Sequence, residues 1–308
     1  MTKAHSLLTL IAFVSLAIAP SWAAAVETAV RITRDVAYLA PDRTEKLDLF
    51  LPATPALGRL SPALVWIHGG GWTGGTKAEA RAQNVCGIVA AAGYVAVNID
   101  YRLGDGAWPT NLHDCKNAVR YLRAHAAELK LDPNRIAVAG GSAGGHLALM
   151  VGMTGDQPEF EPIGAASPYP GVSSRVQAVI NMYGIANLLT RQEVADDGTP
   201  TGKLRAVGPV KVFGAGDPGA AVYRAASPVT HITRTSPPVL ILHGMIDKTV
   251  DRAQAEELAR VLQANGVPHQ LVLVPGAGHT FDLKTWSKKP LSRDLQPVVL
   301  DFLAQHLK

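Results

Sequence analysis

The residues best suited to chemistry form a glycine cluster that holds one serine, Gly140-Gly141-Ser142-Ala143-Gly144. An apolar run at 136–139 precedes the cluster, and a helix-like apolar pattern follows it. A serine hydroxyl is a poor nucleophile unless a sharp strand-to-helix turn exposes it, and glycines at both flanks let strand and helix approach each other. The spacing therefore predicts a nucleophile elbow with Ser142 at its tip.

A serine nucleophile needs a histidine as general base and a carboxylate that holds the tautomer of that histidine. His279 is the candidate base, because it follows the last predicted strand on the glycine-rich loop 276–279. Asp247 is the candidate acid, since it lies just after the preceding strand, and Asp251 competes with it. The sequence thus predicts a triad of Ser142, Asp247 and His279. Four other histidines are interpreted as structural or exposed: His113, His146, His231 and His243.

An oxyanion hole needs further N–H donors aimed at the substrate carbonyl. The stretch His68-Gly69-Gly70-Gly71 ends an earlier predicted strand, and consecutive glycines let the backbone come close to a substrate. We assign the donors to the amides of Gly70, Gly71 and Ala143. Each such donor lowers the barrier by about 3 kcal/mol in comparable sites. The imidazole of His68 is interpreted as a brace for this loop.

The same glycines partly match two cofactor-binding motifs, the dinucleotide fingerprint and the phosphate loop. The spacing Gly69-x-Gly71-x-x-Gly74 with Asp100 after the next strand resembles a dinucleotide fingerprint, but Trp72 is bulky where the turn must be tight. The stretch is also not the first strand-helix-strand unit. A phosphate loop fails because Thr76 stands where lysine is needed, and the chain has no His-Glu-x-x-His or Cys-x-x-Cys motif. We therefore predict neither a cofactor nor a metal ion.

Buried-strand patterns alternate with helical patterns along the chain. After an antiparallel pair within 30–50, strands are predicted at 63–67, 94–99, 136–141, 176–182, 239–242 and 270–274, with 132–134 as a turn. Helices are predicted at about 77–92 and 112–129, directly after Ser142, and at 252–265 and 295–306. This alternation predicts an α/β fold with a mostly parallel central sheet and helices on both faces. Catalytic groups should then gather at the carboxyl ends of the strands.

The N-terminal residues are typical of a secretory signal peptide. Lys3 is followed by an uncharged apolar run from Leu7 to Ala19, then by Pro20 and small residues. The run is too short to span a bilayer, so no stable membrane insertion is expected. We predict a signal peptide at 1–25 and an exported protein in the periplasm or outside the cell.

Residues 26–308 are predicted to form one domain, with an insertion near its C-terminal half. Between 184 and 238 the periodic pattern weakens and glycines and prolines accumulate. This stretch is interpreted as a small lid or cap over the strand ends, with an ordinary long connection as the alternative.

The charge balance gives no sign of a nucleic-acid partner. The 308 residues include 29 Lys and Arg against 25 Asp and Glu, a net charge of +4, and the basic residues form no run or stripe. The two cysteines, Cys86 and Cys115, each lie in a predicted helix, and their spacing does not decide whether they pair. The oligomeric state is equally open.

The motifs together resemble the α/β-hydrolase serine esterases that carry an HGGG-type oxyanion loop. The stretches that carry this resemblance are 68–72, 100–103, Asp114, 140–146, 243–247 and 278–281, within a match covering about 30–308. The chain order Ser142, Asp247, His279 is the order of that fold. Gly141 stands where the hormone-sensitive-lipase-like branch usually has an acidic residue. The chain is most similar to the bacterial BD-FAE-like branch of feruloyl and acetyl-xylan esterases and their carboxylesterase relatives.

The resemblance and the residues together imply an exported esterase that forms an acyl-enzyme. Its expected substrates are short-chain esters, or acetyl and feruloyl groups linked to carbohydrate. Two alternatives stay open: an arylformamidase or peptidase-like amide hydrolase of the same fold, and a catalytically silent α/β-hydrolase that serves as a binding protein.

Overall fold

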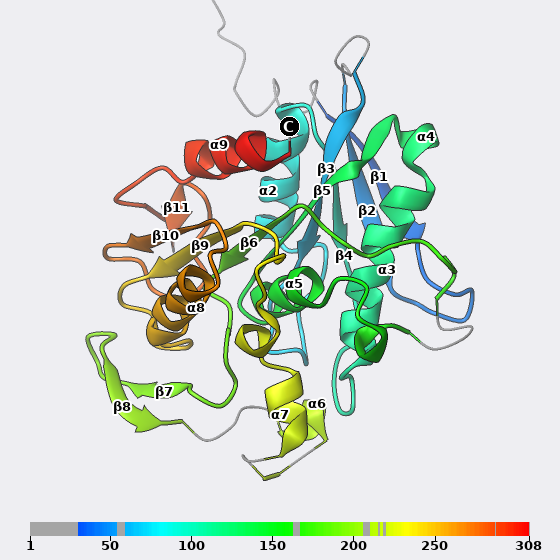
Figure 1. Cartoon of the computed structure of the whole chain (residues 1–308). Coiled ribbons are helices and arrows are strands. Elements are labelled where there is room, and N and C mark those ends of the chain that lie inside the picture. The colour runs from blue at the N-terminus through cyan, green and yellow to red at the C-terminus, as the bar shows by residue number, and fades with distance from the viewer. Residues whose placement is uncertain are drawn as a thin grey trace, which may run out of the picture.

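The central feature of the molecule is a twisted eight-stranded sheet with the strand order β1-β2-β4-β3-β5-β6-β9-β10 (Figure 1). The computed structural model describes residues 30–53, 59–162, 167–205, 210–214, 216–217, 220–286 and 288–307. The predicted signal peptide, residues 1–25, lies outside these ranges.

The sheet is parallel except at one edge, as predicted. Its strands are β1 (Val30–Ala37), β2 (Lys46–Pro52), β3 (Ser61–Ile67), β4 (Val95–Ile99), β5 (Leu131–Gly141), β6 (Ala178–Met182), β9 (Val239–Gly244) and β10 (His269–Val274). β2 pairs antiparallel with both β1 and β4, and the pairs from β4 to β10 are parallel. All parallel strands therefore end at one edge of the sheet.

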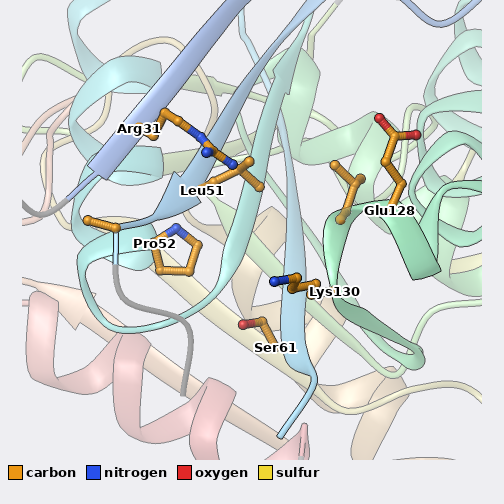
Figure 2. Close-up of a pocket in the computed structure, with 8 residues that line it drawn as sticks. Arg31, Leu51, Pro52, Ser61, Glu128 and Lys130 are labelled. Carbon is orange, nitrogen blue, oxygen red and sulfur yellow. The ribbon is translucent and has the colours of Figure 1, made fainter. Parts of the chain in front are cut away.

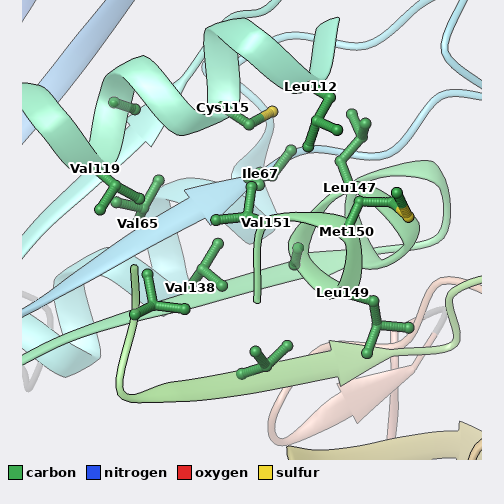
Figure 3. Close-up of a cluster of buried hydrophobic side chains, with 14 of the residues drawn as sticks. Val65, Ile67, Leu112, Cys115, Val119, Val138, Leu147, Leu149, Met150 and Val151 are labelled. Atoms are coloured by element: carbon green, nitrogen blue, oxygen red, sulfur yellow. The ribbon is translucent and has the colours of Figure 1, made fainter. Parts of the chain in front are cut away.

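Helices cover both faces of the sheet, because the strand side chains alternate between two apolar clusters. On one face Val65 and Ile67 pack with helices α3 (Thr110–Ala124), α5 (Ala143–Thr154) and α8 (Ala253–Ala264), and Figure 3 shows part of this cluster. On the other face Leu64 and Trp66 pack with α2 (Ala80–Ala91) and α9 (Gln296–His306). The sheet thus has an apolar layer on each side.

The two cysteines belong to different layers. Cys86 on α2 and Cys115 on α3 are both buried and free, and they pack in the clusters on opposite faces of the sheet. Burial raises the pKa of both thiols, so neither is a reactive thiolate. The open question of a disulfide between them is answered in the negative.

Most predicted boundaries agree with the structure to within two residues, and three predictions differ by more or in the type of element. The helix predicted from residue 77 begins at Ala80. Lys77 lies in the turn before the helix, because its backbone amide donates to Asp100 and its ammonium group pairs with Asp48 of β2. The helix predicted at 112–129 is interrupted at His125, where α4 (Ala126–Leu129) begins. The predicted turn at 132–134 lies inside β5, which starts to pair at Leu131.

The described residues of the segment 184–238, which is predicted as a lid or cap, form short elements. They are β7 (Gln192–Val194), β8 (Pro200–Leu204), α6 (Val210–Phe213), α7 (Ala221–Ala225) and the 3-10 turn Pro228–His231. Figure 1 shows the β7–β8 hairpin and the two helices at the lower side of the molecule. A lid function for the segment stays a prediction.

The remaining described elements are equally small. They are the 3-10 turn Pro158–Phe160 and the two-residue strands β11 (Thr285–Trp286) and β12 (Lys289–Pro290). Within the described residues, no helix combines the length and the hydropathy needed to cross a membrane.

Candidate active site

Ser142 occupies the turn between β5 and α5, at the edge where the parallel strands end. Its backbone is in the left-handed region with φ +56° and ψ −121°, a conformation that costs a non-glycine residue energy. The Ser142 amide donates a hydrogen bond of 2.9 Å to the carbonyl of Met182, which ties the turn to β6. The structure thus forms the elbow that the glycine spacing predicts.

Glycines are required around this turn because backbone atoms fill the space of a side chain. A Cβ atom on Gly144 would lie 2.1 Å from the carbonyl oxygen of Ile67, and one on Gly140 would lie 2.3 Å from the carbonyl oxygen of Gly144. A Cβ atom on Gly69 would meet the carbonyl oxygen of Gly141 at 3.0 Å. Strand β3, strand β5 and helix α5 are therefore in close backbone contact beneath the serine.

The structure brings the three predicted triad residues together, although they are far apart in the chain. His279 Nε2 lies 3.0 Å from Ser142 Oγ, and His279 Nδ1 lies 2.7 Å from Asp247 Oδ2. The other carboxylate oxygen, Asp247 Oδ1, accepts the backbone N–H groups of Thr249 at 2.8 Å and Val250 at 3.0 Å. A serine, a base and a buried orienting acid are thus connected by hydrogen bonds.

The acid is ionised in spite of its position inside the protein. The Asp247 side chain is fully buried, and burial alone would raise its pKa. Hydrogen bonds from His243 and His279 more than offset this effect and hold the pKa of Asp247 well below its ordinary value. The competing candidate, Asp251, instead accepts a hydrogen bond of 2.9 Å from the backbone N–H group of Gln192. It thereby anchors the inserted segment.

The predicted oxyanion loop lies beside the serine. Gly70 and Gly71 both adopt positive φ, +112° and +62°, which glycine tolerates and other residues rarely adopt. Among the described residues, none accepts a backbone hydrogen bond from the amides of Gly70, Gly71 and Ala143. Gly70 and Gly71 line the hollow described below together with Ser142, and Ala143 follows Ser142 at the start of α5, so these amides are the candidate donors of an oxyanion hole.

His68 behaves as the brace that its position predicts. Its ring is buried, stacks on Tyr101 with 4.4 Å between ring centroids, and places Nδ1 2.6 Å from the Gly69 carbonyl. The hydroxyl of Tyr101 donates to the His68 carbonyl at 3.0 Å. Burial lowers the pKa of His68, so the ring stays neutral and serves the loop rather than the proton transfers.

His146 links the oxyanion loop to the inserted segment, a role that the sequence does not reveal. The indole N–H of Trp72 donates to His146 Nδ1 at 3.2 Å, and His146 Nε2 donates to the carbonyl of Ala226 at 2.7 Å. Burial lowers the pKa of His146 to about 4. Trp72 also packs edge-on against Phe213 of α6, with 5.3 Å between ring centroids. The segment 184–238 therefore supports the loop that carries the oxyanion donors.

A clamp on the loop of His279 comes from helix α2. Arg81 donates from Nη2 to the carbonyl of Thr280 at 2.8 Å and from Nε to the carbonyl of Phe281 at 3.1 Å. Asn84, one turn further along the helix, donates to the Asp282 carboxylate at 2.8 Å. The sequence analysis missed both residues, because a polar side chain on a helix gives no local sign of a partner 198 to 200 residues away.

A hollow of about 350 Å³ opens above the triad. Its lining consists mainly of glycine backbone and polar side chains: Gly69, Gly70, Gly71, Glu79, Arg81, Gly141, Ser142, Tyr183, Thr249, His279 and Thr280. Tyr183 is the one large aromatic side chain in that lining. The hollow therefore combines hydrogen-bonding groups with one large aromatic side chain.

A larger hollow of about 430 Å³ lies at the opposite edge of the sheet (Figure 2). It is lined by Ser61 at the start of β3, by Leu51 and Pro52 at the end of the antiparallel β2, and by residues 128–130 before β5. It contains no histidine that could activate Ser61. Among the described residues, no three His, Cys, Asp or Glu side chains lie close enough to bind a metal ion.

The chain is similar to known esterases in sequence and in structure. The family model described as BD-FAE matches residues 47–262. Esterase LipC of Mycobacterium tuberculosis is 35% identical over 79% of this chain and 58% of its own length. The chain thus spans less than two thirds of that relative.

Two solved structures match nearly the whole fold. A truncated carbohydrate esterase from gut microbiota is 25% identical with a TM-score of 0.73, and the match covers 91% of this chain and 97% of that one. Thermogutta terrifontis esterase 2, phosphoramylated by tabun, is 27% identical with a TM-score of 0.70, covering 90% and 94%.

Proposed function

Because this chain belongs to the BD-FAE family and has the α/β-hydrolase fold, we propose that it is an exported serine esterase that works through an acyl-enzyme. Its proposed substrates are small carboxylic esters, or acetyl and feruloyl esters of carbohydrates. The observation that carries the proposal is the continuous hydrogen-bonded chain from Asp247 through His279 to Ser142 Oγ, with contacts of 2.7 and 3.0 Å.

In the acylation step, His279 Nε2 accepts the proton of Ser142 Oγ while the oxygen attacks the ester carbonyl carbon. The carbonyl oxygen becomes an oxyanion, and the amides of Gly70, Gly71 and Ala143 stabilise it. Asp247 stabilises the imidazolium that forms. His279 then gives its proton to the leaving alkoxide as the ester bond breaks, which leaves an acyl group on Ser142 and a free alcohol.

Deacylation repeats these steps with water in place of serine. His279 accepts a proton from the water as its oxygen attacks the acyl carbon, and the same three amides hold the second oxyanion. The proton then returns to Ser142 Oγ as the acyl bond breaks. The products are a carboxylic acid and the original enzyme, so the cycle needs no cofactor.

The lining of the hollow supports a small acyl group and a polar alcohol. Each buried CH₂ group stabilises binding by about 0.8 kcal/mol only when apolar surface is available to cover it. Beyond Tyr183, the lining offers glycine backbone and hydrophilic side chains such as Glu79 and Arg81. A carbohydrate can hydrogen-bond to these groups, and a hollow of about 350 Å³ favours a short acyl group over a long alkyl chain. The similarity to a carbohydrate esterase agrees with this proposal.

The decisive experiment is hydrolysis of p-nitrophenyl acetate, butyrate and octanoate and of methyl ferulate by the wild type and by Ser142→Ala. We expect turnover to fall from acetate to octanoate and to disappear in the variant. Circular dichroism would establish that the variant is folded. Turnover that persists at the wild-type rate in Ser142→Ala would contradict the proposal.

The two alternative functions give different results in the same assay. Hydrolysis of an aryl formamide but of no ester would favour the amide hydrolase. If the folded wild type turned over nothing and Ser142 did not react with an organophosphonate, a binding protein would be favoured.

Export is part of the proposal and has its own test. N-terminal sequencing of the protein from the periplasm or the medium should find cleavage after Ala23 or Ala25. Val14→Arg interrupts the apolar run and should keep the uncleaved protein inside the cell. A cytoplasmic, uncleaved wild type would contradict export without affecting the proposed chemistry.

A further inference from the structure

A second histidine contacts the acid of the triad from inside the protein. His243 lies near the end of β9, four residues before Asp247, and both side chains are fully buried. His243 Nε2 lies 3.4 Å from Asp247 Oδ2, the same oxygen that accepts His279 Nδ1 at 2.7 Å. Two imidazole rings therefore share one carboxylate oxygen.

The tautomer of His243 follows from its other contact. His243 Nε2 lies 3.0 Å from the carbonyl oxygen of Val250, which can only accept a hydrogen bond. The proton must therefore be on Nε2. His243 Nδ1 is buried and has no hydrogen-bond partner among the described residues, as expected for the unprotonated nitrogen of a neutral ring. The Nε2–H group thus donates to Val250 and, over the longer distance, to Asp247.

Both oxygens of the carboxylate have N–H groups close by. Oδ1 accepts the backbone N–H groups of Thr249 and Val250, and Oδ2 accepts the His279 Nδ1–H group at 2.7 Å with the His243 Nε2–H group 3.4 Å away. The acidic group of Asp251 and the guanidinium group of Arg191 contribute the further charges near this pair. A carboxylate with four donors around it has one defined rotation, which directs Oδ2 at His279.

We propose that His243 is a positioning residue of the triad, which fixes the Asp247 carboxylate and takes up part of the charge on Oδ2 through its Nε2–H group. This inference rests on the proposed function. The second donor makes Oδ2 a weaker partner for a cationic His279 than a carboxylate with a single imidazole donor would be. His243 touches neither the substrate nor Ser142.

The test compares His243→Leu, which removes the donor, with His243→Gln, whose amide nitrogen can occupy the position of Nε2. In His243→Leu we expect the acid limb of the kcat profile to move to higher pH. The plateau kcat should fall about 10- to 100-fold through the misplaced acid, with KM little changed. His243→Gln should restore the acid limb to its wild-type position. His113→Leu on α3 serves as a control for the loss of a histidine away from the triad.

Several outcomes would overturn the inference. A folded His243→Leu enzyme whose acid limb stays in place would show that His243 only fills space. If His243→Leu does not fold, His243→Asn is the substitute variant. The asparagine side chain is too short to reach Oδ2, so the acid limb should again move to higher pH. A failure of Gln to restore the limb would equally count against a donor role.

A readout without turnover separates this inference from the proposed function. The proton between His279 Nδ1 and Asp247 Oδ2 should give a downfield proton NMR signal, and its position should change in His243→Leu and return in His243→Gln. If the wild type hydrolyses none of the esters, the proposed function fails, yet the NMR comparison still decides the pairing. An unchanged signal in His243→Leu would refute the inference.

Discussion

The two halves of the active site are built in different ways. On the nucleophile side, Ser142 and the oxyanion loop are placed by backbone contacts so close that Gly140 and Gly144 leave no room for a Cβ atom. On the base side, a backbone contact at Gly244 joins the loops of Asp247 and His279, and side chains add further support, chiefly the Arg81 clamp from helix α2.

This difference determines how each half should respond to change. A backbone contact cannot adjust without moving a strand or a helix, because the interior is packed as densely as a crystal. A side-chain hydrogen bond to a loop can be lost singly, and the loop then samples other positions. The nucleophile side should therefore fail as a unit, whereas the base side should lose activity in steps.

The largest expected effect comes from changing the acid of the base side, Asp247. Asp247→Asn should lower kcat by about 10⁴-fold, because the amide cannot stabilise the imidazolium and favours the wrong tautomer of His279. Asp251→Asn is the matched control, since Asp251 binds the Gln192 amide of the inserted segment. Its kcat in the same ester assay should stay within about tenfold of the wild type. Equal losses in the two variants would reopen the choice of acid.

The next effect concerns the backbone contacts of the nucleophile side. Gly144→Ala puts a Cβ atom 2.1 Å from the Ile67 carbonyl oxygen, and we expect it to lower the free energy of unfolding by about 3 kcal/mol or more. Gly87→Ala on helix α2 is the control, because a Cβ atom at that position meets nothing within 4 Å. This variant should raise the free energy of unfolding by about 0.5–1 kcal/mol. Urea unfolding measures both. A fully stable, active Gly144→Ala protein would break the comparison.

Acid should weaken the fold through three histidines whose pKa burial lowers, His68, His113 and His146. Burial lowers the pKa of His146 and of His113 to about 4, against an ordinary value of about 6.5. Between these values the unfolded chain binds protons that the folded protein does not, so the free energy of unfolding falls as pH drops from about 6.5 to 4. Each histidine contributes a slope of at most about 1.4 kcal/mol per pH unit.

Urea unfolding across this pH interval measures that slope. Because His146 joins Trp72 to Ala226, His146→Gln should remove one of these contributions and make stability less sensitive to acid. An unchanged slope in the variant would show that His146 is not among the titrating groups.

The smallest expected effects come from the clamp on the loop of His279. Arg81→Ala should lower kcat by about 10- to 100-fold, because a base displaced by an ångström transfers protons poorly. Arg81→Lys should recover little, since an ammonium group cannot reproduce the planar fork to two carbonyls. Asn84→Ala removes one hydrogen bond from the same helix, about 1 kcal/mol, and should cost less than either. An equal loss from Asn84→Ala would mean that the loop has no principal clamp.

The sequence predicts the fold and the group of reactive residues because both depend on local patterns. Buried strands read as continuous apolar runs, and the elbow needs small residues at fixed spacing around Ser142. The carboxyl edge of a parallel sheet then brings Asp247 and His279 to the serine without any knowledge of side-chain contacts. The sheet, its helices and the meeting of the three triad side chains therefore follow from chain order and periodicity.

The missed features depend on contacts between distant segments. Arg81 looks like any polar residue on a surface helix, and nothing near it in sequence indicates the carbonyls of the His279 loop. The predicted helix start at residue 77 is wrong because the Lys77 side chain pairs with Asp48, which lies on strand β2. For His243 a local signal did exist, since it lies at the end of β9 and precedes Asp247 by only four residues.

The left-handed backbone at Ser142 places the requirements of chemistry and stability in opposition at a single residue. The conformation that lifts the hydroxyl above the sheet is one that glycine adopts freely and serine does not. A copy of the gene released from selection for hydrolysis would therefore tolerate glycine at position 142, with a backbone under less strain than before. Loss of function by this route leaves an intact, folded protein, so a descendant of this enzyme that has become a binding protein should be recognisable by a glycine at the tip of its elbow.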